Sequence, residues 1–161
     1  MRKVLTVMSC LLVVAVMLSG TAYAEWMWAQ GNVGEIEYPA NCTYKYFGWG
    51  LDIAQKPGLY NWIHLPVPSK AGGTWGARYI RLRFYTGSAD ALVSEIHVYN
   101  GSTKVKTFLG LGLSNGWKDL QFDLGSKMYF TRGMGISVRI GAGVESMSHR
   151  FIFSAAGANF Y

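Results

Sequence analysis

Apolar and polar residues alternate through most of this 161-residue chain. Ile80, Leu82 and Phe84, for example, are separated from one another by two arginines. A repeat of two places successive side chains on opposite faces of a β-strand, so that one face packs into a core and the other meets solvent. No stretch of twelve or more residues keeps the 3.6-residue repeat of an amphipathic helix. The alternation therefore predicts an all-β domain.

Turn signals separate the alternating segments. Expected strands run over 34–38, 45–49, 60–67, 79–85, 92–99, 104–108, 117–124, 136–140 and 151–155. Residues 69–77 form the clearest predicted loop. Asn100-Gly101 lies between two alternating runs and indicates a hairpin, because both residues tolerate a positive φ. Seven to nine short strands predict a single antiparallel β-sandwich with a jelly-roll-like arrangement.

Residues 1–24 have the three parts of a secretory leader. A basic start is followed by the apolar run 4–18 and by Ala22-Tyr23-Ala24, which fits a signal-peptidase site. The run is shorter than the roughly 20 residues that span a bilayer. We expect cleavage after Ala24, which leaves one domain over 25–161 with no later membrane-spanning helix. This leader indicates a bacterial protein that is secreted or periplasmic.

Removal of the leader also changes the charge and the cysteine count. The formal charge falls from +6 to +4 when Arg2 and Lys3 are lost. Cys10 is lost as well, so Cys42 stays alone and is expected to be a buried small residue that forms no intramolecular disulfide. The modest, dispersed charge and the export signal argue against nucleic acid as a partner.

Several short motifs resemble a family of small uncharacterised bacterial β-sandwich proteins, classed as a domain of unknown function. The motifs are Gly48-Trp49-Gly50, Tyr60-Asn61-Trp62-Ile63-His64-Leu65-Pro66, Ile96-His97-Val98-Tyr99-Asn100-Gly101, Gly135-Ile136-Ser137-Val138 and Phe153-Ser154-Ala155-Ala156-Gly157-Ala158-Asn159-Phe160. The resemblance covers about residues 46–160. It implies the β-sandwich fold and supplies no activity, cofactor or catalytic residue.

Basic and aromatic side chains are the main candidates for binding a ligand. Arg81 and Arg83 share one strand face, and Lys104 and Lys106 share another. If the two faces coincide, they form a basic surface lined by tyrosines such as Tyr99. Arginine and lysine bind anionic groups, and aromatic rings stack on flat apolar faces. An ordinary solvated sheet face is the competing interpretation, because alternation alone requires polar outward residues.

Three tryptophans are the best candidates for exposed contacts. Trp26 and Trp28 follow the cleavage site two residues apart, and Trp75 lies in the glycine-rich loop. Exposed aromatic residues often mark binding surfaces. The predicted ligand-binding residues are Trp26, Trp28, Trp75, Arg81, Arg83 and Tyr99.

Motifs for catalysis, metals and cofactors are weak. Gly112-Leu113-Ser114-Asn115-Gly116 fits the G-x-S-x-G pattern, but the nucleophile elbow needs a helix after the serine, and an alternating strand follows here. Glu35 and Glu37 share a strand face, which solvent-facing acids do more often than catalytic pairs. The three histidines are too scattered to predict a metal site, and no glycine run completes a phosphate loop. We expect no metal and no cofactor.

The sequence therefore favours an exported, non-catalytic β-sandwich that binds a glycan or another component of the cell envelope. Two alternatives stay open. One is a small outer-membrane β-barrel, which needs strands of roughly ten residues. The other is a small secreted hydrolase that uses Ser114 or the Glu35/Glu37 pair. The ligand and the oligomeric state do not follow from the sequence.

Overall fold

The computed structural model describes residues 23–70 and 74–161, so residues 1–22, most of the expected leader, lie outside the described residues. Residues 71–73 of the predicted loop lie outside them as well. In the described part of the chain, two antiparallel sheets pack face to face. The predicted β-sandwich is thus confirmed, and the described residues form eleven strands where seven to nine were expected.

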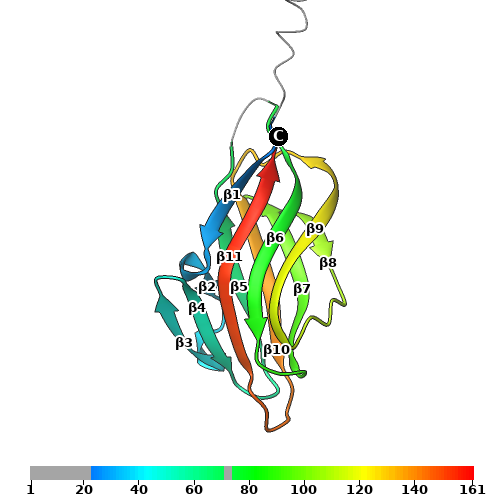
Figure 1. The fold of residues 1–161 in the computed structure, drawn as a ribbon. Coiled ribbons are helices and arrows are strands. Elements are labelled where there is room, and N and C mark those ends of the chain that lie inside the picture. Colours follow the sequence, from blue (N-terminus) through cyan, green and yellow to red (C-terminus); the bar gives the residue numbers. More distant parts are fainter. Residues whose placement is uncertain (1–22, 71–73) are drawn as a thin grey trace, which may run out of the picture.

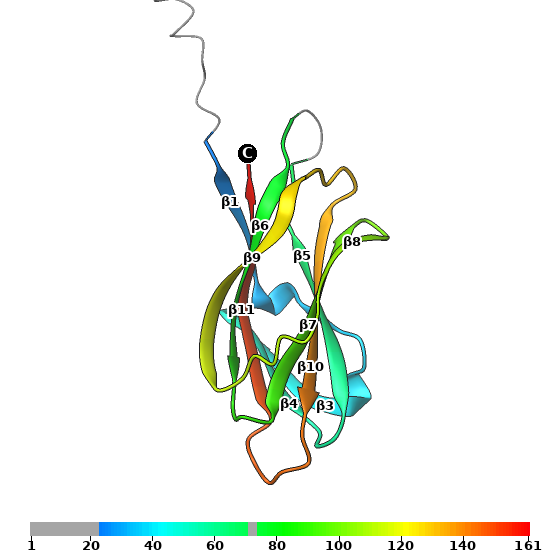
Figure 2. The same ribbon diagram turned by 90° about the vertical axis from the view of Figure 1, so that its right-hand side faces the viewer.

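Figure 1 looks onto sheet A, and Figure 2 shows the two layers from the side. Sheet A contains β1 (Glu25–Gln30), β3 (Cys42–Phe47), β4 (Gly50–Gln55), β6 (Ala77–Thr86), β9 (Gly116–Met128) and β11 (Arg150–Phe160). Sheet B contains β2 (Glu35–Ile36), β5 (Tyr60–Val67), β7 (Ala91–Asn100), β8 (Thr103–Phe108) and β10 (Met134–Ala142). Two short 3-10 helices, η1 (Gly31–Val33) and η2 (Pro39–Asn41), lie on either side of β2 in the chain.

The chain passes repeatedly from one sheet to the other, which gives the jelly-roll-like arrangement. Sheet A has the order β3-β4-β11-β6-β9, and sheet B has the order β2-β5-β10-β7-β8. From β4 to β7 and again from β9 to β11, successive strands belong to alternate sheets. Each sheet therefore has one face on the shared core and one outer face, and the outer faces are where alternation places the polar residues.

The core lies between the sheets and follows the alternation of the strands. Fully buried apolar side chains come from both layers, among them Ile80, Leu82, Phe84, Ile136, Val138, Ile140, Phe151 and Phe153. Strand β7 departs from a simple alternation because the register shifts: Arg139 pairs with Glu95, whereas the next residue, Ile140, pairs with Val93. Ser94 has no partner in this ladder, so Val93 is buried in the core.

Strand β11 has two partners along the same edge. Its first residues, Arg150–Phe153, pair with β4, and Ala155 onward pairs with β1. Gly31, directly after β1, packs so closely that a Cβ at this position would overlap the backbone carbonyl of Phe153. Glycine at position 31 therefore lets the chain leave β11 and make room for β4.

Cys42 begins β3 and is buried, as expected for a small residue of the core. Burial raises the pKa of its thiol, although Lys56 acts in the opposite direction. Asn61 Nδ2 lies 3.5 Å from the sulfur. The environment therefore favours the unreactive thiol form. Among the described residues, none belongs to a helix that is long and apolar enough to cross a membrane.

Candidate functional site

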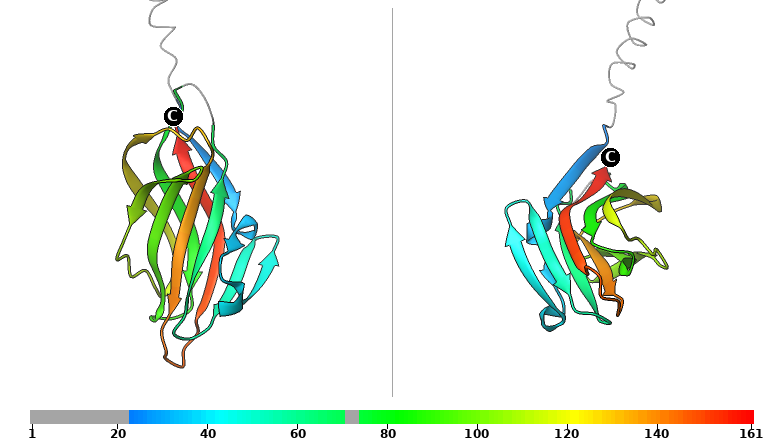
Figure 3. Two further views of the ribbon diagram at one scale, coloured as in Figure 1. Left: turned by 180° about the vertical axis from the view of Figure 1, so that it is seen from behind. Right: turned by 60° about the horizontal axis from the view of Figure 1, so that its bottom comes forward.

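The outer face of sheet B gathers side chains from its three central strands. Residues that pair directly across strands share a face. The pairs form three rows: Pro66, Gly135 and Tyr99; His64, Ser137 and His97; and Trp62, Arg139 and Glu95. We call these nine residues, with Tyr60, Glu35 and Glu37 at the margin, the sheet B face. It is the surface seen in the left panel of Figure 3, with β10 along its middle.

A hollow of about 290 Å³ opens on this face, and its lining includes Glu35, His64, Pro66, Gly135 and Ser137. Gly135 adds no side chain to this lining, and a Cβ there would come no nearer than 3.9 Å to the Cβ of Tyr99. The hollow is therefore open above the backbone and bordered by polar groups on β2, β5 and β10.

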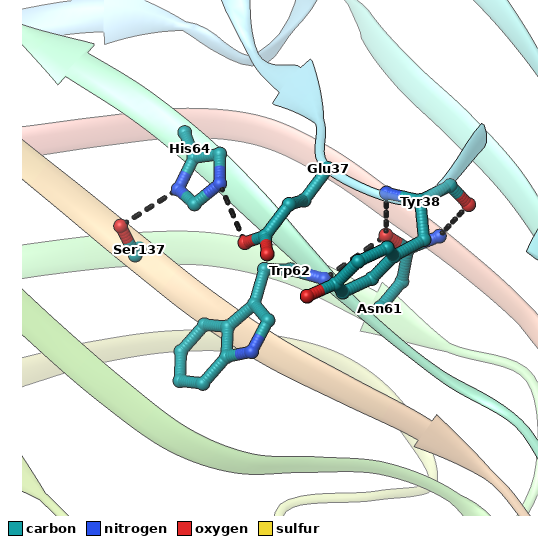
Figure 4. Close-up of polar contacts among 6 residues, drawn as sticks. All are labelled: Glu37, Tyr38, Asn61, Trp62, His64 and Ser137. Carbon is teal, nitrogen blue, oxygen red and sulfur yellow. Dashed lines mark hydrogen bonds and ion pairs between the residues drawn. The ribbon is translucent and has the colours of Figure 1, made fainter.

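His64 of β5 connects β10 and the segment that follows β2 through its two ring nitrogens (Figure 4). Its Nδ1 lies 2.8 Å from Ser137 Oγ, and its Nε2 lies 3.1 Å from Glu37 Oε2. A carboxylate only accepts hydrogen bonds, so neutral His64 carries its proton on Nε2 and donates it to Glu37. The Ser137 hydroxyl then donates to Nδ1, and this network holds His64 and Glu37 in fixed orientations beside the hollow.

The order serine, histidine and carboxylate resembles that of a hydrolytic triad, but the surroundings do not support attack on a carbonyl. Ser137 lies in β10, which pairs with β5 on one side and β7 on the other. Its neighbouring backbone N–H groups are used by the two ladders, so they do not form an oxyanion hole. The arrangement is suited to exchanging hydrogen bonds with hydroxyl groups.

Aromatic rings lie next to this network. The ring centroids of Trp62 and His97 are 4.6 Å apart, and those of His97 and Tyr99 are 6.3 Å apart. Burial lowers the pKa of His97, and Lys104 lowers it further, while Glu95 acts in the opposite direction. His97 is therefore neutral at neutral pH. One residue from each row, namely Trp62, His97 and Tyr99, together form an uncharged aromatic strip across β5 and β7.

Arg139 connects the aromatic strip to charged groups. Its guanidinium donates to Glu95 Oε1 at 3.0 Å and lies 4.7 Å from the ring centre of Tyr60. Tyr60 is exposed. The ion pair fixes the planar guanidinium against the ring, so this end of the sheet B face offers a flat surface edged by hydrogen-bond donors.

The structure divides the predicted ligand-binding residues between two faces. Trp26 and Trp28 of β1 lie on the outer face of sheet A, the face that carries Arg81 and Arg83. Trp28 shares a row with Arg81, and Trp26 shares one with Tyr79. Tyr99 lies on the sheet B face and pairs with Lys104. The arginine and lysine faces do not coincide, because β6 and β8 belong to different sheets, so the condition for a joint basic surface is not met.

Trp75 lies apart from both groups. It is half-buried and packs against the core, where its indole covers apolar side chains. Lys70 Nζ lies 3.7 Å from the centre of its ring. Its place in a glycine-rich loop led to the expectation of an exposed contact, and the structure shows a half-buried indole at this position.

The structure also shows where the residues considered for catalysis lie. Ser114 is followed, after Asn115, by strand β9, so the strand–turn–helix geometry of a nucleophile elbow does not occur there. Glu35 lies in β2, and Glu37 follows it and contacts His64. Within residues 23–70 and 74–161, no group of three or more His, Cys, Asp or Glu side chains is arranged to hold a metal ion.

Sequence reasoning missed Trp62, Ser137 and Arg139 as members of a site. A signal was available, because Ile63, Leu65 and Val67 alternate and so direct Trp62 outward. The pairing of β5 with β10 was not readable from the sequence, since it joins segments far apart in the chain; His64 and Ser137, for instance, are separated by 73 positions.

Comparison with known proteins shows the fold. A low-affinity xylan-binding module, CBM86, from Roseburia intestinalis has a TM-score of 0.55 and 9% identity, over 85% of this chain and 96% of that one. A mutant of a family 29 carbohydrate-binding module in complex with cellulohexaose has a TM-score of 0.47 and 12% identity, over 86% and 93%. A family 35 carbohydrate-binding module from Clostridium thermocellum has a TM-score of 0.45 and 14% identity, over 86% and 98%.

No family model matches the chain, and no curated protein matches its sequence. The resemblance to a domain family of unknown function therefore stays a prediction.

Proposed function

We propose that this protein is an exported, non-catalytic domain that binds a glycan chain on the sheet B face. The observation that carries the proposal is the combination on one face of an open hollow over Gly135, the fixed Glu37–His64–Ser137 network and the Trp62–His97–Tyr99 strip. The leader expected at residues 1–24 would deliver the domain to the compartment where such polymers occur.

Sugar rings need two kinds of contact, and the sheet B face offers both. Their C–H faces pack on flat aromatic rings, as Trp62 and Tyr60 provide. Their hydroxyls donate and accept hydrogen bonds, for which the carboxylate of Glu37 and the guanidinium of Arg139 are placed at the margin. A binding function uses these groups without the oxyanion hole that hydrolysis of an ester or amide would need.

The choice of first ligand follows from the fold. CBM86, the structure with a TM-score above 0.5 reported above, is a xylan-binding module. Xylan is therefore the first glycan to test, with cellulose- and mannose-derived hexasaccharides as alternatives of similar length.

Isothermal titration calorimetry with xylohexaose tests the proposal. We expect Trp62→Ala to weaken binding at least about tenfold, because an aromatic contact at the centre of a site contributes more than about 1.4 kcal/mol. His64→Ala should weaken it as well, since Glu37 and Ser137 then lose their common partner.

Tyr44→Ala is the matched control, because Tyr44 is 47% exposed and belongs to sheet A. It should bind as the wild type does. Equal loss in Tyr44→Ala and Trp62→Ala would show that binding does not use the sheet B face. Absence of heat with every hexasaccharide at millimolar concentration would overturn the proposed function.

A further inference from the structure

A second hollow lies on the opposite side of the molecule. It has a volume of about 300 Å³ and is lined by Trp28, Arg81, Arg83, Asp119 and Ala155 on the outer face of sheet A. Strands β1, β11, β6 and β9 all contribute to it, and Figure 1 shows these four strands side by side. None of its residues belongs to the sheet B face.

Small residues of β11 form the floor of this hollow, and Trp28 forms a wall. Gly157 pairs with Trp28 on one side and with Arg81 on the other, so all three share the outer face. A Cβ at Gly157 would lie 2.5 Å from Trp28 Cε3, which shows that the indole lies directly on the glycine backbone. The Trp26 ring stacks on Trp28 with the ring centroids 5.4 Å apart. Trp28 is still 43% exposed, so part of its ring is accessible to a ligand.

The charges in the hollow do not balance. Arg81 Nε donates to Asp119 Oδ1 at 2.6 Å. Arg83 is exposed, and among the described residues no carboxylate lies within 4.0 Å of its guanidinium. Two guanidinium groups thus face a single carboxylate, which leaves one positive charge without a partner inside the hollow.

The absence of an ion pair distinguishes Arg83 from the other described arginines that lie on strands. Arg78, Arg139 and Arg150, which also lie on strands, each form an ion pair with an acidic side chain at 3.0 Å or less. Arg83 instead lies 5.6 Å from the ring centre of Trp117, which is itself exposed. A planar guanidinium that keeps its donors free can bind a carboxylate or a sulfate through two parallel hydrogen bonds.

Aromatic rings flank the free arginine on both sides. Strands β1 and β9, which carry Trp28 and Trp117, are three strand spacings or ~14 Å apart across sheet A. Trp28 shares the row of Arg81 and Trp117 that of Tyr85, so the two indoles lie on opposite sides of Arg83 along β6 as well. A small inorganic anion would use the arginine alone, whereas a ring that bears an acidic group would use the arginine and a tryptophan together. We propose that the outer face of sheet A is a second binding site, for sugar units of an acidic polysaccharide that carry a carboxylate or a sulfate.

This site is separate from the one in the proposed function and does not depend on it. The test uses polygalacturonate, with alginate and chondroitin sulfate as further acidic chains, and fully methyl-esterified polygalacturonate as the uncharged match of the first. We expect the purified protein to bind at least one acidic chain and to bind the esterified chain at least tenfold more weakly.

Variants then locate the binding. Arg83→Gln and Trp28→Ala should each weaken binding of the acidic chain about tenfold or more, and Arg83→Lys should lose less than Arg83→Gln because the charge stays. Arg132→Gln is the matched control, since Arg132 is exposed, has no carboxylate within 4.0 Å among the described residues, and lies far from the hollow in the turn before β10. It removes the same charge and should change binding less than twofold.

Any of four results would overturn the proposal. The first is that no acidic chain binds. The second is equal loss in Arg83→Gln and Arg132→Gln, which would show attraction by net charge only. The third is unchanged binding in Trp28→Ala, which would show that no sugar ring stacks there. The fourth is a loss of acidic-chain binding in Trp62→Ala, which would place the acidic chain on the sheet B face, whereas unchanged binding there supports two separate sites.

Discussion

Single residues on the sheet B face owe their chemistry to what surrounds them. His97 is enclosed by Trp62 and Tyr99 and has Lys104 nearby, so its pKa is lowered despite the contact with Glu95 at 3.3 Å. His64 has exposed surroundings and two fixed hydrogen-bond partners. Two histidines that look alike in the sequence thus have different roles, one as part of an uncharged strip and one as a polar connector.

The lowered pKa of His97 predicts a loss of stability in mild acid. The unfolded chain takes up a proton at this residue near pH 6.5. The folded protein binds that proton only at lower pH, so the stabilising contribution is complete above the ordinary pKa and is lost as the pH falls through the folded one. The free energy of unfolding should therefore decrease from pH 7.5 to pH 5.

Urea unfolding of the wild type and of His97→Asn at the two pH values measures this effect. The decrease should be smaller in His97→Asn than in the wild type. An NMR titration in which the His97 ring takes up its proton above pH 6.5 would contradict the expectation.

Strands with an uninterrupted alternation of apolar and polar residues were predicted correctly from the sequence. The expected strand over 60–67 has the observed bounds of β5, because Ile63, Leu65 and Val67 mark one face without interruption. Strand β1 was missed, since Trp26, Met27 and Trp28 are apolar on both faces and show no alternation. Burial of Val93 follows from a bulge, which a repeat of two does not reveal.

The exact centre of a turn and the pairing of distant strands could not be predicted from the sequence either. The hairpin between β7 and β8 occurs as expected, but Asn100 pairs with Thr103, so the turn is centred on Gly101-Ser102, with Gly101 at φ +57°. The alternation within β6 was enough to predict that Arg81 and Arg83 share one face. The proximity of Trp28 to these arginines could not be predicted, because β1 is connected to β6 only through β11, at the other end of the chain.

The exchange of partners along β11 predicts that Gly31 is essential. In Gly31→Ala the new Cβ would overlap the Phe153 backbone, and neither backbone can move without breaking the pairing of β1 or β4. We expect a loss of about 3 kcal/mol in the free energy of unfolding, at the upper end of the usual range for overpacking.

Gly48→Ala provides the comparison, because a Cβ at Gly48 would meet nothing within 4 Å. Its free energy of unfolding should stay within about 0.5 kcal/mol of the wild type. If both variants unfold at the same urea concentration, the close packing at Gly31 does not limit the fold.

For the whole molecule, the important feature is that the two proposed binding faces lie on opposite sides of one core. The sheet B face uses β2, β5, β10 and β7, and the second site uses β1, β11, β6 and β9. No strand contributes to both. A ligand on one face therefore leaves the contacts of the other face unchanged.

Ligand stabilisation should then be additive. A ligand at one hundred times its Kd raises the free energy of unfolding by about 2.7 kcal/mol. Xylohexaose and the acidic chain, each at that excess, should together raise it by about twice as much. Chemical unfolding with each ligand and with both measures the sum, and a combined effect no larger than that of one ligand would indicate a shared site.

The pairing of Glu25 with Phe160 brings the two ends of the described chain together at one tip (Figures 1 and 2). A short peptide from Tyr161 back to Glu25 would close the backbone into a ring, and the ring could be reopened at Gly101-Ser102 to give a circular permutant with both outer faces intact. For the same reason, a larger protein fused at either end would display the domain from its tip and leave both faces accessible.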